Sequence, residues 1–124
     1  MTPNEYKELC LRTEKPININ IGVPTNRLLH AAMGMCTESG EFTDGIKRNI
    51  FYHKPFNVVN LIEELGDILW YVSIAIDALG TSFEEVMQAN ISKLQKRYPE
   101  GFSDEKAINR NLEEEIKALE EETK

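Results

Sequence analysis

The chain has 124 residues, of which 41% are hydrophobic and 28% charged, and its formal net charge is −7 at pH 7. This length suits one domain with a modest core, so we predict a single domain over residues 1–124, with about 104–124 as a C-terminal helical extension. The negative charge argues against binding a nucleic-acid polymer or a membrane surface, because either would require a basic field.

A leader and a membrane span are not expected. The first residues do not follow a basic-then-apolar pattern, and the longest apolar stretch, residues 68–79, contains Ser73 and Asp77 and is too short to cross a bilayer. Cys10 and Cys36 lack a close-paired spacing. We therefore predict reduced thiols in a cytoplasmic protein rather than a disulfide framework.

A first helix is predicted from Pro3 to about Thr13, because Thr2 can serve as its N-cap and proline suits the first helical position. Residues 14–24 contain two prolines and a glycine among alternating isoleucine and asparagine. This composition predicts an extended connection, although the alternation also resembles a strand.

The second helix is expected from Asn26 to about Phe51, with Thr25 as its cap. Three small residues share the side that carries Glu38 and Glu41: Ala31, Gly34 and Gly45. They leave room for ions and a ligand, or they permit close helix packing; the two interpretations are compatible, and the sequence favours neither.

A turn at residues 52–56 should lead into a third helix, with Asn57 as its cap and Gly80 as its C-terminal stop. Helical spacing predicts an apolar core face on this helix. That face consists of Val58, Leu61, Ile62, Leu65, Leu69, Val72 and Ile76. Glu64 and Asp67 share a different side with Asn60 and Tyr71, so we expect the acidic pair at the edge of the core face.

A fourth helix is predicted from the capping-box pair Ser82 and Glu85 to about Tyr98. Polar residues line up beside its apolar band at offsets of three and four: Asn90, Lys93 and Arg97. They form either an anion-binding strip or a solvated basic face. After Ser103, one last helix with a thin apolar stripe is expected to pack on a neighbouring subunit or to fray.

The two acidic pairs, Glu38 with Glu41 and Glu64 with Asp67, have the same three-residue spacing. Residues three apart project from one side of a helix, so each pair forms a small acidic patch. Four converging carboxylates repel one another unless divalent cations neutralise them. Because the ligands are hard oxygens without histidine or thiolate, the pattern favours Mg²⁺ or Mn²⁺.

The motifs Glu38-Ser-Gly-Glu41 and Glu64-Leu-Gly-Asp67 resemble the ExxE…ExxD signature of the MazG-like all-α nucleoside triphosphate pyrophosphohydrolases. The resemblance covers roughly residues 5–110. It includes residues 63–71 and 90–103, and it is closest to the short single-domain members. It implies an all-α bundle of four to five helices that is completed by association into a homodimer or homotetramer.

The resemblance also implies a reaction, which is cleavage of an NTP or dNTP between the α and β phosphates to give the monophosphate and pyrophosphate. The four acids would bind Mg²⁺, with Mn²⁺ as a possible substitute, and Glu38 or Glu41 would orient or deprotonate the attacking water. The implied substrate-binding residues are Asn90, Lys93, Arg97, Lys47, Lys54 and Tyr71.

Other classes fit less well. The phosphate-binding P-loop and the Rossmann glycine fingerprint are both absent, and neither histidine accompanies a signature nucleophile. A di-iron carboxylate bundle would need Glu-x-x-His pairs, which the sequence lacks. A non-catalytic helical metal-binding or interaction bundle stays open as the alternative.

Overall fold

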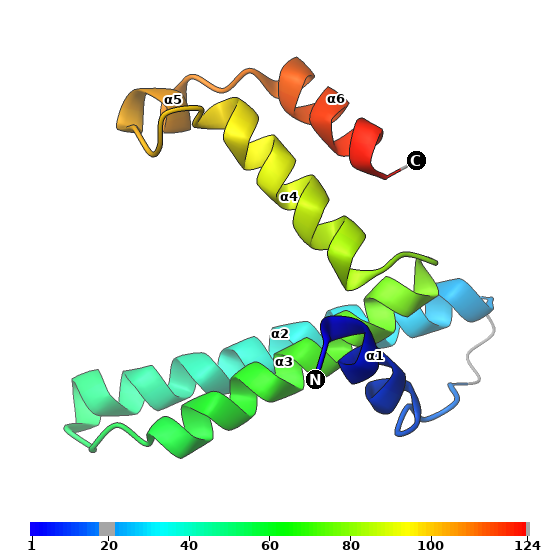
Figure 1. Ribbon diagram of the computed structural model, residues 1–124. Coiled ribbons are helices and arrows are strands. Elements are labelled where there is room, and N and C mark those ends of the chain that lie inside the picture. The colour runs from blue at the N-terminus through cyan, green and yellow to red at the C-terminus, as the bar shows by residue number, and fades with distance from the viewer. Residues whose placement is uncertain (18–21, 124) are drawn as a thin grey trace. The chain divides into compact units, whose positions relative to one another are not determined.

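The computed structural model describes residues 1–17 and 22–123, so Ile19 and Ile21 of the predicted connection lie outside the described residues. All regular secondary structure in the described part is α-helical, which confirms the predicted all-α class (Figure 1). Six helices are described there, where four to five were expected. They belong to two compact units, Met1–Gly80 and Thr81–Lys124, which we describe in turn.

The first unit is a long helical hairpin with a short helix docked on it. The hairpin pairs α2 (Val23–Tyr52) with α3 (Val58–Ala78), and α1 (Pro3–Leu11) packs on α3. Asn57 caps α3 as predicted, since its side chain accepts a hydrogen bond from the backbone N–H of Asn60. Gly80 follows the helix with a positive φ of 69°, which suits the predicted stop.

Two hydrogen bonds from side chains fix α1 and the segment after it against α3. The Tyr6 hydroxyl donates to the backbone carbonyl of Gly66 at 3.1 Å, and the Trp70 indole N–H donates to the Thr13 hydroxyl at 2.8 Å. Bonds that join such distant parts of the chain set the position of α1 beside the middle of α3. This is the level of the acidic motif on that helix.

The second helix begins earlier than predicted. It starts at Val23, and its N-cap is Gly22 with a φ of 92°, so the prediction that Thr25 caps the helix is wrong. Pro24 lies in the first turn, where a missing N–H costs nothing. Glycine tolerates the positive φ that the chain needs to enter the helix there.

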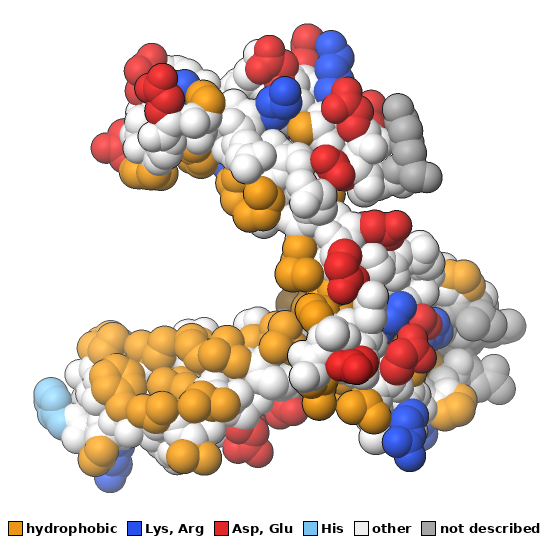
Figure 2. Space-filling view, in the orientation of Figure 1, with side chains coloured by type: hydrophobic (Ala, Val, Ile, Leu, Met, Phe, Trp, Pro, Cys, Tyr) orange, Lys and Arg blue, Asp and Glu red, His pale blue; other side chains and the backbone are white. Residues whose placement is uncertain are grey.

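The predicted core face of α3 is also wrong in part. Val58, Ile62, Leu65 and Leu69 are 47–63% exposed, whereas Glu64 is only 5% exposed. Within the first unit, α3 therefore turns its acidic side toward α2, and the other described parts of that unit leave an apolar stripe of α3 exposed. Hydrophobic side chains cover the corresponding face of the hairpin in Figure 2. Helical periodicity identifies such a stripe but cannot show which element, if any, covers it.

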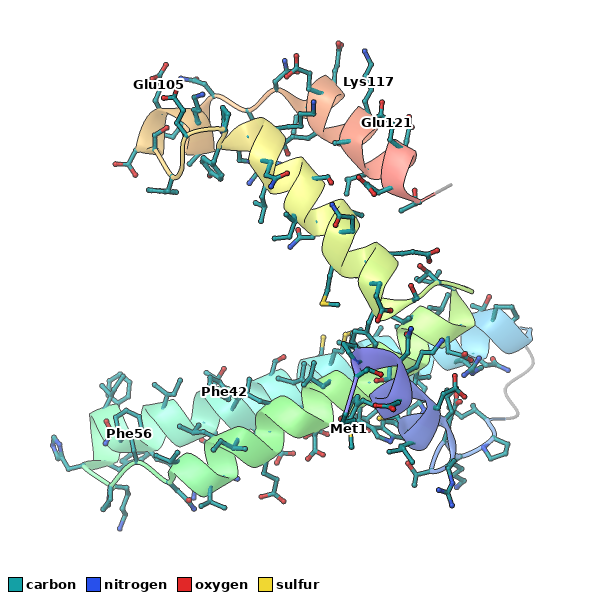
Figure 3. All side chains as sticks on the ribbon, in the orientation of Figure 1. Met1, Phe42, Phe56, Glu105, Lys117 and Glu121 are labelled. Carbon is teal, nitrogen blue, oxygen red and sulfur yellow. The ribbon has the colours of Figure 1, made fainter. Side chains whose placement is uncertain are left out.

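The second unit contains α4 (Phe83–Arg97), α5 (Asp104–Ile108) and α6 (Leu112–Glu122), and α6 packs on α4. The predicted capping box of Ser82 and Glu85 is present at the start of α4. The single last helix is wrong, because Asn109 ends α5 and Asn111 caps a new helix through its side chain. Its packing on α4 contradicts the expectation that the segment frays, while packing on a neighbouring subunit stays a prediction. Lys117 and Glu121 mark α6 in Figure 3.

Candidate metal centre

Three of the four predicted acids come together between α2 and α3. Glu38, Glu41 and Glu64 each offer one carboxylate oxygen, and these oxygens all lie within 4.8 Å of one another. The three side chains differ in exposure: Glu64 is buried, Glu38 is half-buried and Glu41 is exposed. The site therefore opens toward solvent on the side of Glu41.

Asp67, the fourth acid, lies near Glu38. Both residues line an open hollow of about 400 Å³ together with Thr13, Trp70 and Tyr71. Asp67 does not belong to the group of three converging oxygens, although its charge acts on Glu38. The acids thus form a tight cluster of three, with Asp67 beside it.

The electrostatics of this cluster are unfavourable for ionised acids. Burial raises the pKa of Glu38 above its ordinary value, and the nearby charges of Glu41, Asp67 and Glu64 raise it further. Among residues 1–17 and 22–123, none of the four acids forms an ion pair with a lysine, arginine or histidine. The described residues therefore leave this negative charge without a cationic partner.

A divalent cation fits this arrangement. The buried carboxylate of Glu64 requires a counter-charge, and a cluster composed only of carboxylate oxygens matches the preference of Mg²⁺ and Mn²⁺. Glu38, Glu41 and Glu64 have the closest geometry for such an ion. Asp67 would complete the set from beside Glu38.

The small residues of α2 permit close packing against α3. A side chain at Gly34 would collide with the ring of Tyr71, and a Cβ atom at Gly45 would come within 3.0 Å of Leu61. Ala31 is fully buried. Of the two readings left open by the sequence, close packing therefore accounts for Gly34 and Gly45.

Tyr71 is held in an aromatic group. Its ring makes edge contacts with Trp70, at a centroid distance of 4.9 Å, and with His30, at 5.4 Å. Tyr71 and Trp70 also line the hollow beside Glu38 and Asp67. A ligand in the hollow would therefore lie beside aromatic side chains as well as carboxylates.

The two predicted lysines of the first unit have different surroundings. Lys47 pairs with Asp44 at 3.1 Å on the surface of α2. Lys54 lines a cavity of about 490 Å³ at the α2–α3 turn, and the described residues around that cavity include no acid. Arg48, Asn57 and Asn60 also line this cavity, so it offers several hydrogen-bond donors to an anion.

The polar strip of the second unit lies on α4. Asn90 is exposed and Lys93 is half-buried. Arg97 is already engaged, because its Nε and Nη2 donate to the two carboxylate oxygens of Glu115 at 2.9 and 2.6 Å. An anion that binds Arg97 must use its remaining nitrogen or replace Glu115.

Two residues without a predicted role form hydrogen bonds with predicted site residues. The amide of Asn60 donates to Glu64 at 2.7 Å, and Glu115 binds both Arg97 and Arg110. The spacing of Asn60 and Glu64, four residues apart on a helix, could have indicated the first contact. No local signal indicates the second contact, because Glu115 lies on a different helix from Arg97.

The described residues contain no helix that combines the length and the apolar character of a membrane span. Residues 28–102 match the family model described as the MazG nucleotide pyrophosphohydrolase domain. The matched region contains both acidic motifs and the polar strip of α4, and it extends over both compact units.

Two curated relatives match parts of the chain. The Gene 37 protein of Mycobacterium phage L5 is 32% identical over 88 residues, which are 67% of this chain and 76% of the phage protein. A Bacillus subtilis (strain 168) protein named uncharacterized protein YvdC is 47% identical over 38 residues, which are 31% of this chain and 36% of that protein. No solved structure matches. With a family model matched over more than half of its length, and with both acidic motifs inside the match, the chain belongs to the MazG nucleotide pyrophosphohydrolase family.

Proposed function

We propose that this protein hydrolyses a nucleoside or deoxynucleoside triphosphate between the α and β phosphates, giving the monophosphate and pyrophosphate. The observation that carries this proposal is the cluster of three carboxylates from two helices, which lacks a cationic partner among the described residues. Membership of a nucleotide pyrophosphohydrolase family supports the reaction class. The single domain over residues 1–124 is part of the same proposal.

Glu38, Glu41, Glu64 and Asp67 would hold Mg²⁺, or Mn²⁺ in its place. The bound cation would supply Lewis-acid stabilisation of the charge on the phosphate oxygens. The protein contributes a pre-formed set of oxygens on two packed helices, so little reorganisation is needed when the ion binds.

Either Glu38 or Glu41 would accept the proton of the attacking water. Glu41 is the exposed member of the cluster and faces the side from which solvent enters, while Glu38 lies between the cluster and the hollow lined by Asp67.

Each unit, taken by itself, carries proposed substrate-binding groups. In the first unit, Lys54 faces the cavity at the α2–α3 turn, Lys47 adds a surface charge on α2, and Tyr71 contributes its ring to the hollow. In the second unit, Lys93 and Arg97 lie four residues apart on one side of α4 and would bind phosphate oxygens, with Asn90 bonding to sugar or phosphate.

The proposal also includes assembly into a homodimer or homotetramer. Val58, Ile62, Leu65 and Leu69 form an apolar stripe on α3 at intervals of four, three and four residues, which is the spacing of a coiled-coil seam. The same stripe on a second copy would cover it in a two-fold arrangement. Among the described residues, Ile74 and Ser73 are the largest side chains with under 2% exposure, and this small fully buried core agrees with an additional interface.

The reaction is tested by incubating the protein with a panel of NTPs and dNTPs in Mg²⁺ or Mn²⁺ and identifying the products. Monophosphate plus pyrophosphate supports the proposal, and diphosphate plus phosphate contradicts the position of cleavage. Metal-dependent stabilisation without turnover of any nucleotide would instead favour the non-catalytic metal-binding bundle.

We expect Glu41→Gln and Asp67→Asn each to lower pyrophosphate release at least about 100-fold, the scale of losing one electrostatic contact to a transition state. Both substitutions keep the shape of the side chain, so helicity measured by circular dichroism should not change. Glu63→Gln is the matched control, because Glu63 directly precedes Glu64 on α3 but is exposed and does not belong to the cluster. Full turnover by both Glu41→Gln and Asp67→Asn would reject the proposed site.

A further inference from the structure

Asn60 contacts the buried acid of the cluster from one helical turn away. Its side-chain Nδ2 donates to Oε1 of Glu64 at 2.7 Å, and both residues lie on α3. Glu64 is only 5% exposed and forms no ion pair with a described residue. The amide is therefore a neutral donor to a buried carboxylate that lacks a cationic partner.

This bond restricts the orientation of Glu64. The terminal torsion of glutamate is broad, so an isolated Glu64 carboxylate could rotate within the space between the helices. A donor fixed on the same helix takes one lone pair of Oε1 and selects one orientation. In that orientation Glu64 has an oxygen within 4.8 Å of the ligand oxygens of Glu38 and Glu41.

We propose that Asn60 is a positioning residue, whose amide orients Glu64 so that Glu38, Glu41 and Glu64 present a pre-formed oxygen site to a divalent cation. The inference rests on the proposed function, because it assumes that the cluster binds a metal. Partners of this kind, which hold a ligand without touching the ion, typically change metal affinity by about 10- to 100-fold when they are removed.

A purely structural role for the side chain has less support. The contribution of Asn60 to the start of α3 comes from its backbone N–H, which donates to the side chain of Asn57 and would survive a substitution at position 60. Asn60 is half-buried and lines the open cavity at the α2–α3 turn, so a different side chain can be accommodated there. The specific loss on substitution is therefore the bond to Glu64.

The test measures Mn²⁺ affinity in the absence of nucleotide, by titration with detection of free Mn²⁺ by electron paramagnetic resonance. Asn60→Leu keeps the size of the side chain but removes the donor, and Asn60→Ala is a second variant without the donor. Asn60→Gln keeps an amide that can reach Glu64. Asn49→Leu is the matched control, since it removes a comparable amide bond, to the Lys54 carbonyl, that does not involve the cluster.

We expect Asn60→Leu and Asn60→Ala to weaken Mn²⁺ binding about tenfold or more, while Asn60→Gln and Asn49→Leu bind like the wild type. Melting curves without metal should change little in all four variants. Unchanged Mn²⁺ affinity in Asn60→Leu and Asn60→Ala, with binding lost in Glu64→Gln, would overturn this inference and leave the proposed function intact. Absence of Mn²⁺ binding in the wild type would overturn both.

Discussion

Gly34 of α2 lies directly against the ring of Tyr71 of α3, and no side chain fits between them. Glycine costs helix stability, about 1 kcal/mol relative to alanine, so its use in the middle of a long helix needs a packing reason. Here the reason is the aromatic group of Tyr71, Trp70 and His30 beside the acidic cluster. The close approach brings α2 near enough to α3 for carboxylates of both helices to meet.

Gly34→Ala should therefore destabilise the protein by about 1–3 kcal/mol, because the added methyl group displaces the Tyr71 ring. Gly40→Ala is the control on the same helix, since a Cβ atom there meets nothing within 4 Å. It should stabilise the protein by up to about 1 kcal/mol. Urea unfolding of both variants measures the difference, and equal stabilisation of the two would contradict the packing at Gly34.

Substitution of Lys93 tests whether this single cationic side chain binds phosphate. A cation that holds phosphate equally in the ground and transition states acts through uniform binding, so its loss raises KM and leaves kcat nearly unchanged. We expect Lys93→Ala to raise KM about tenfold, the scale of one charge-assisted hydrogen bond. Lys96→Ala, an exposed lysine on the same helix, is the control. A loss of kcat at constant KM would show that Lys93 acts in another way.

At the scale of elements, the pairing of α4 with α6 depends on a buried carboxylate. Glu115 of α6 is 3% exposed and accepts hydrogen bonds from Arg97 of α4 and from Arg110. The hydrogen bonds from Arg97 and then Arg110 lower the pKa of Glu115 from 4.5 to about 2. The ionised form of Glu115 therefore stabilises the folded second unit.

The sign of the pH dependence follows from this lowered pKa. The stabilisation is fully present above about pH 4.5 and is lost as the pH falls toward 2, because the unfolded chain takes up the proton first. Glu115→Gln should lower the melting temperature at pH 7 and show a smaller further decrease between pH 4.5 and 2. Glu114→Gln, which changes an exposed neighbour, should keep the wild-type dependence. Identical acid profiles for Glu115→Gln and the wild type would refute this role.

At the scale of the whole molecule, the proposed assembly rests on the apolar stripe of α3 that the first unit leaves exposed. Ile62 is 63% exposed and lies within this stripe, whereas Val59 is 77% exposed but lies about a quarter of a turn to one side. A row of exposed apolar side chains along one side of a helix is typical of a protein interface.

Ile62→Glu should consequently shift the protein from an oligomer to a monomer, because the charge would be buried in the two-fold interface. Val59→Glu places the same charge outside the stripe and should leave the oligomer intact. Light scattering coupled to size-exclusion chromatography measures both masses. A monomeric wild type would rule out the proposed assembly, and an oligomeric Ile62→Glu would place the interface elsewhere.

Local chemistry determined much of this protein from the sequence alone. The capping box of Ser82 and Glu85, the Asn57 cap and the stop at Gly80 depend on neighbouring residues, so the order and approximate limits of the long helices were predictable. The three-residue spacing of Glu38 and Glu41, and of Glu64 and Asp67, likewise identified the acidic motifs without any knowledge of packing.

Tertiary structure decided which faces meet. Periodicity placed the apolar stripe of α3 in the core, but the structure turns the side with Glu64 and Tyr71 toward α2, because glycines on α2 allow that approach. The partners of Glu115 and the break between α5 and α6 were also beyond local reasoning, since they depend on contacts between distant segments. Sequence spacing specifies the shape of each helix surface, whereas the choice of partner depends on how several such surfaces fit together.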